Sequence, residues 1–175
     1  MHLPASSGWL LVALCAATGA YCLLRLRSDV EEQRRAAGGE AVMGFGMAAM
    51  AVPAAVFTPP SWAWPGYAAL FGAAALHALW AARAGAHHLH HLVGACAMVY
   101  MAVTMAASPG HGSAGVPVLT GTLLLYFTGY VLVAGVRLVP VAPGAGAVRL
   151  GDRPELARAC RLSMGIAMVA MLLTV

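Results

Sequence analysis

Residues 116–139 read VPVLTGTLLLYFTGYVLVAGVRLV, an apolar run in which no charged side chain precedes Arg137. A helix needs about 20 mostly apolar residues to cross the roughly 30 Å hydrocarbon core of a bilayer. The run is long enough for one crossing, so we predict a transmembrane helix here.

Five further apolar runs of similar length lie along the chain. With the first, they are expected at residues 7–24, 41–57, 64–82, 89–107, 116–139 and 156–175. In the whole chain 61% of residues are hydrophobic and 9% are charged, which leaves too little polar surface to cover a water-soluble globule. The sequence therefore predicts an all-α integral membrane bundle of six transmembrane helices, forming a single domain over residues 1–175 with the lipid bilayer as its solvent.

The ten basic residues are all arginines, and their distribution predicts the orientation in the membrane. They lie after the first run, after the third run and around the connection between the fifth and sixth runs, whereas the other connections have none. By the positive-inside rule, both termini lie outside and residues 140–155, rich in proline and glycine, form a cytoplasmic loop. The arginines do not form a basic face with interleaved aromatic residues, so nucleic-acid binding is not expected.

Few ionisable side chains fall within the runs, and these are candidates for function because burying them in a membrane is costly. They are Glu40, His77, His87, His88, His90 and His91. Their spacing from nearby arginines puts the carboxyl group and the imidazoles at similar depth on three helices. We expect one metal site near the cytoplasmic interface. His90 taken alone is interpreted as an interfacial residue.

Methionines recur in triplets with helical spacing, so that each triplet forms a stripe on one helix face. The triplets are Met43, Met47 and Met50, then Met98, Met101 and Met105, then Met164, Met168 and Met171. Thioethers with imidazoles suit Cu(I), whereas carboxylate with imidazole suits zinc, so copper is the first choice and zinc an alternative. The expected metal ligands are Glu40, His77, His87, His88, His91, Met43, Met47 and Met98.

Two other interpretations stay open at this point. In one, the protein is a structural or partner-binding membrane subunit in which the methionines only pack, either as a homo-oligomer or with another membrane protein. In the other, His77 and His91 are axial ligands of a b-type haem between helices. The chain has no nucleophile elbow, phosphate-binding loop or HExxH motif, so enzymatic activity is not favoured.

The histidine-rich run His87-His88-Leu89-His90-His91-Leu92, together with residues 97–101 and 40–50, resembles an actinobacterial family of small multi-helix integral membrane proteins catalogued as a domain of unknown function. The resemblance extends over nearly the whole chain. It implies a bacterial plasma-membrane location and a helical architecture, and it brings no reaction, substrate or site.

Overall fold

A computed structural model of the chain describes residues 5–28, 31–82, 89–107, 115–137 and 154–174. These residues form six α-helices and no strand, which confirms the all-α prediction. The helices are α1 (Ala5–Arg25), α2 (Glu31–Met50), α3 (Ala63–Ala82), α4 (Leu89–Ala107), α5 (Pro117–Val136) and α6 (Pro154–Leu172).

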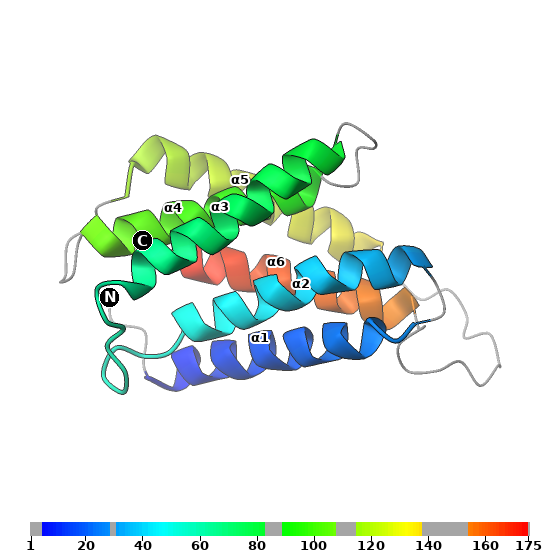
Figure 1. Cartoon of the computed structure of the whole chain (residues 1–175), viewed down its shortest axis with the longest axis horizontal. Coiled ribbons are helices and arrows are strands. Elements are labelled where there is room, and N and C mark those ends of the chain that lie inside the picture. Colours follow the sequence, from blue (N-terminus) through cyan, green and yellow to red (C-terminus); the bar gives the residue numbers. More distant parts are fainter. Residues whose placement is uncertain (1–4, 29–30, 83–88, 108–114, 138–153, 175) are drawn as a thin grey trace.

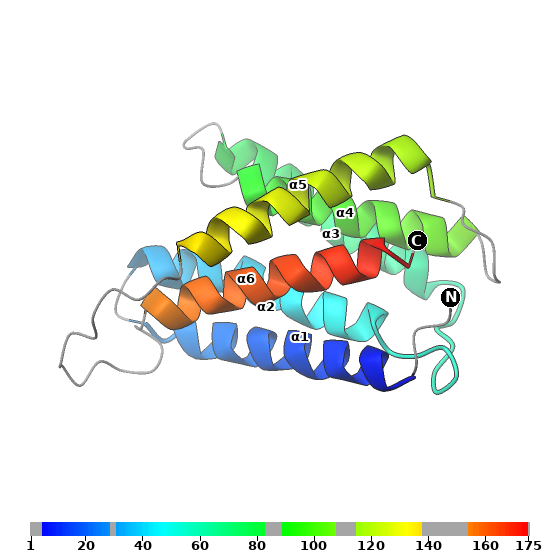
Figure 2. The same ribbon diagram turned by 180° about the vertical axis from the view of Figure 1, so that it is seen from behind.

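Consecutive helices pair into three hairpins, α1 with α2, α3 with α4 and α5 with α6 (Figures 1 and 2). Contacts of α6 with α1 and α2, and of α2 with α4, join the hairpins into one bundle. The start of α1 and the end of α6 lie at the same end of this bundle (Figure 1). The arginines of α1, α2 and α6 lie at the other end, where α1 finishes and where α2 and α6 start.

The second helix differs most from its expected range of 41–57. It begins at Glu31 because the polar residues before the apolar run also adopt helical structure, with an ion pair of 2.5 Å between Glu31 and Arg35 one turn apart. It ends at Met50, shortly before Pro53, which has no N–H to continue the helical ladder. Residues 51–57 form turns, in which the Val56 amide donates to the Pro53 carbonyl at 2.9 Å.

Three helices in the described part of the chain are long and apolar enough to cross a membrane: Ser6–Arg25 within α1, α4 and α5. Six such helices were predicted, and three of the described helices meet the criterion. Two other helices, α2 and α6, are not apolar enough by the same criterion. Acidic and basic residues occupy the first half of α2 and the first turns of α6. In α3, the residues from Trp64 to Tyr67 at its start, together with His77, lower the mean hydropathy.

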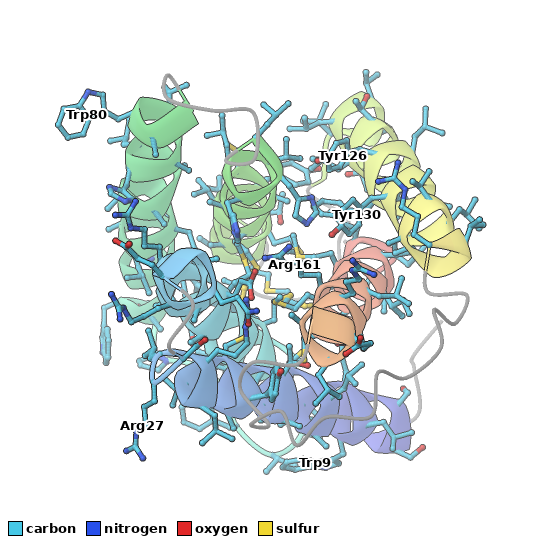
Figure 3. The ribbon with its side chains drawn as sticks, turned by 90° about the vertical axis from the view of Figure 1, so that its right-hand side faces the viewer. Trp9, Arg27, Trp80, Tyr126, Tyr130 and Arg161 are labelled. Atoms are coloured by element: carbon cyan, nitrogen blue, oxygen red, sulfur yellow. The ribbon has the colours of Figure 1, made fainter. Side chains whose placement is uncertain are left out.

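Large apolar side chains are exposed along the helices while two charged side chains are buried, the reverse of a water-soluble protein. Trp80 is 72% exposed and Leu125 is 78% exposed, whereas Arg25 and Glu40 are 0% exposed. Figure 3 shows Trp9 and Trp80 projecting away from the bundle. This distribution is typical of a protein whose helices face lipid.

Glycines allow the first two helices to pack backbone against backbone. A Cβ atom at Gly44 of α2 would lie 2.9 Å from the Cα of Gly19 in α1 and 3.1 Å from the carbonyl oxygen of Cys15. At Gly46, the next glycine of α2, a Cβ would overlap the ring of Phe71 from α3. Small residues of this kind let membrane helices approach closely.

Replacing Gly44 with alanine is expected to destabilise the protein by roughly 1–3 kcal/mol, because the added methyl group meets backbone atoms that cannot rotate away. Thermal unfolding in detergent would measure the effect. Gly39 of the same helix has nothing within 4 Å of its Cβ position, so Gly39→Ala is the matched control and should unfold at or above the parent temperature. Equal melting of Gly44→Ala and the parent would contradict this close contact.

Candidate functional site

Glu40 of α2 is buried and joins three helices through its carboxylate. Arg25, in the last turn of α1, donates from Nη1 to Oε2, and Arg161 of α6 donates from Nε to Oε1 at 2.7 Å. The thiol of Cys22 also points at Oε2, with a sulfur–oxygen distance of 3.7 Å. We call Arg25, Glu40 and Arg161 the charged triad.

The two arginines of the triad differ in their surroundings. Arg25 is fully buried, and its Nε and Nη2 atoms have no hydrogen-bond partner among the described residues. The side chain of Arg161 is 42% exposed, so its guanidinium reaches from the interior toward the arginine-bearing end of the bundle. From the sequence, both arginines were interpreted as residues that set the orientation in the membrane. Neither was identified as a partner of Glu40. The sequence feature that could have indicated this pairing was the position of Arg161 inside the sixth apolar run.

A small cavity of about 30 Å³ lies beside the charged triad. Side chains of α2, α4, α5 and α6 surround it: Glu40, Met43, His90, His91, Gly94, Phe127, Arg161, Met164, Gly165 and Met168. A volume of this size holds one or two water molecules or a single ion. We call it the triad cavity.

The fold brings together part of the predicted metal site. Glu40, Met43 and His91 all line the triad cavity, as expected from their similar depth on α2 and α4. Met47 and Met98 are buried in the adjoining core. Both carboxylate oxygens of Glu40 are engaged by arginines, a partnership that residue spacing did not predict.

Of the three remaining predicted ligands, the structure describes one, and it lies away from the cavity. His77 is exposed on the outer surface of α3 and does not line the triad cavity with His91. The two are therefore not arranged there as an axial pair for a haem. His87 and His88 lie outside the described residues.

His90, interpreted from sequence as interfacial, is instead half-buried in an aromatic pocket of α5. Its ring stacks on Tyr130 with centroids 3.9 Å apart, and its Nδ1 lies 3.2 Å from the hydroxyl of Tyr126. Both tyrosines point from α5 toward the bundle interior (Figure 3). The spacing of four from Gly94 and eleven from Met101 puts His90 on the inner face of α4, and this was the signal in the sequence.

The three methionine stripes face one another in the centre of the bundle. Met47, Met98, Met101 and Met168 are each at most 3% exposed. Figure 3 shows sulfur atoms, in yellow, gathered between the helices. The core cluster contains six buried and two half-buried members of the triplets: Met47, Met50, Met98, Met101, Met168, Met171, Met43 and Met164. Only Met105 of the nine is outside it. A Cβ at Gly94 would lie 3.1 Å from the Met43 methyl carbon, so this thioether packs directly against α4.

Within the described ranges, no three residues among histidine, cysteine, aspartate and glutamate are grouped so that they could hold a metal ion. The donor atoms that the fold does gather are thioether sulfurs, with the imidazoles of His90 and His91 at one end. This donor set is soft and electrically neutral.

Replacing Glu40 with glutamine should destabilise the protein by about 3 kcal/mol or more, since it leaves the buried Arg25 guanidinium without a counter-charge. Melting temperatures in detergent, measured for purified parent and variant, would test this. Glu31→Gln is the control, because its pairing with Arg35 is exposed to solvent and should matter little. If both variants melt alike, the charged triad does not hold the bundle together.

The family model described as Domain of unknown function (DUF5134) matches residues 32–175, which include the triad cavity and all three methionine stripes but not Arg25. Among curated proteins and among solved structures no match was found. The matched range is most of the chain and confirms the resemblance to a domain-of-unknown-function family. The chain belongs to the family described as Domain of unknown function (DUF5134).

Proposed function

We propose that this protein binds a soft metal ion, Cu(I) in the first place, inside a bundle of transmembrane helices. The observation that carries the proposal is the convergence of methionines from α2, α4 and α6 on one buried cluster. Leucine would fill the same apolar space equally well, and the chain contains many leucines. These inner positions nevertheless hold methionine. Thioether sulfur is a preferred ligand of Cu(I).

The triad cavity is the place we assign to the ion. Three thioethers, those of Met43, Met164 and Met168, line it together with the imidazoles of His90 and His91. The contact of His90 Nδ1 with Tyr126 leaves Nε2 as the ring nitrogen for a metal bond. A hydrogen bond on the other ring nitrogen is the usual way to orient a ligating histidine.

The charged triad favours a monovalent ion with neutral ligands. Two guanidinium groups and one carboxylate give the triad a net charge of +1 before any ion enters. Unit charges 4 Å apart repel by about 4 kcal/mol at an effective dielectric constant of 20, and a divalent ion doubles that figure. We therefore favour Cu(I) over zinc, with Glu40 as a counter-ion that positions Arg161 rather than as a direct ligand.

The other two hypotheses are less well supported by the geometry. A haem needs far more room than a cavity of about 30 Å³ provides, and its expected axial histidine on α3 is exposed. A structural or partner-binding subunit without metal would also contain packed methionines. This structural hypothesis gives no reason for imidazoles to lie beside the sulfur atoms. Metal analysis of the purified protein distinguishes it directly from the copper hypothesis.

For the membrane arrangement, we infer six spans in a bacterial plasma membrane, with both termini outside and the arginine-bearing end in the cytoplasm. Support comes from the start of α1 and the end of α6 at one end of the bundle, the arginines of α1, α2 and α6 at the other and the apolar exterior. The charged side chains that face inward make α2 and α6 less hydrophobic than a helix that crosses the membrane alone. Pairing of these charges inside the bundle offsets the cost of placing them in the membrane.

We expect the purified protein to bind one Cu(I) per chain under reducing conditions. The triple substitution of Met43, Met164 and Met168 by leucine should weaken binding by roughly 100-fold or more, because it removes soft ligands while conserving volume. Titration against a chromogenic Cu(I) chelator gives the affinity, and X-ray absorption of the loaded protein should detect sulfur neighbours.

Met105→Leu serves as the matched control, since Met105 belongs to a stripe but not to the core cluster. It should bind Cu(I) like the parent, and the melting temperatures of all variants should be similar. A parent protein that takes up no Cu(I), or a triple variant that binds it unchanged, would overturn the copper hypothesis in favour of a purely structural role.

The orientation predicts which residues can be labelled from outside the cell. Trp62, 74% exposed in the connection after α2, should be accessible to a membrane-impermeant maleimide when replaced by cysteine, whereas Arg27→Cys should react only after permeabilisation. Both substitutions are made in a background in which Cys96 and Cys160, the cysteines that are not buried, are replaced by serine. Labelling of both sites in intact cells would rule out the proposed arrangement.

A further inference from the structure

A groove runs along the outer surface where α1, α2 and α3 meet, on the side away from the triad cavity. Its volume is about 540 Å³, within the usual size range of ligand pockets. Apolar side chains form most of the wall, among them Leu23, Leu26, Val42, Phe45, Ala49 and Leu70. Among the residues that the structure describes, no charged side chain lines it.

The length of the groove matches one leaflet of a bilayer. On α2 it extends from Gly38 to Ala49, a distance of about 16 Å at the helical rise of 1.5 Å per residue. Half of the hydrocarbon core is roughly 15 Å. The groove is therefore about as long as the acyl chains of one leaflet. Its end at Ala49 lies one residue before α2 finishes, and its other end, at Leu26 and Gly38, is the one nearer the arginine-bearing end of the bundle.

Two exposed arginines lie where the groove meets that end. Arg27 follows the groove residue Leu26, and it projects outward in Figure 3. Arg34 lies one turn before Gly38, on the same face of α2. Their neighbour Arg35 is paired with Glu31, but neither Arg27 nor Arg34 forms a salt bridge with a described acidic residue.

We propose that the groove binds an anionic phospholipid, whose acyl chain lies along α2 and whose phosphate is held by Arg27 and Arg34. Guanidinium groups pair with phosphate through two parallel hydrogen bonds, and the cytoplasmic leaflet supplies anionic lipids. The inference rests on the proposed six-span orientation and is independent of the metal site.

Native mass spectrometry of the detergent-purified protein tests this with two added lipids of identical chains, phosphatidylglycerol and phosphatidylcholine. We expect phosphatidylglycerol to bind the parent at least tenfold more tightly. Replacing Arg27 and Arg34 together by glutamine should reduce that affinity by about tenfold or more, to near the level of phosphatidylcholine.

Arg158→Gln is the matched control, because Arg158 is exposed at the same end of the bundle but belongs to α6 and not to the groove. Filling the groove with Val42→Trp, or with Ala49→Phe should the first variant not fold, is expected to weaken both lipids. Equal binding of the two lipids by the parent, or unchanged phosphatidylglycerol binding after the groove is filled, would overturn the proposal. Cu(I) titration of the double arginine variant should match the parent, which separates a failure here from a failure of the copper site.

Discussion

The pairing of one buried carboxylate with two guanidinium groups is the constraint on which the other features of the site depend. A charged group away from water is costly unless it is paired and hydrogen-bonded. Glu40 meets that condition by binding Arg25 of α1 and Arg161 of α6. The triad thereby fixes the relative positions of three helices at one end of the bundle, and it makes a guanidinium part of the cavity wall.

Glycine and methionine complement each other in the interior. Close approach at Gly19 and Gly44 brings α1 against α2, while flexible thioethers occupy the less regular space between α2, α4 and α6. Methionine adapts its shape to such space because it is unbranched. The same side chains give the centre of the bundle polarisable sulfur atoms, so the residues that pack the core are also those proposed to bind the ion.

Much of the helical architecture can be predicted from the sequence, but which side chains contact one another cannot. The apolar run at 89–107 coincides with α4, and the depth of Glu40 relative to His91 was predicted from helical rise alone. Spacing fixes depth and helix face, whereas contacts also depend on how helices are ordered and rotated. For this reason the two guanidinium groups that bind Glu40 were not predicted, and the inward placement of His90 was missed.

The contact between Arg25 and Glu40 also bears on how the chain enters the bilayer during synthesis. An isolated α2 would carry an unneutralised acid into hydrocarbon, an unfavourable step for a helix of such modest hydropathy. Because α1 precedes α2 directly and packs tightly against it, the two can enter as a preformed pair that is already electrically balanced. In the proposed six-span arrangement, the first hairpin would then be the unit of insertion on which the later helices assemble.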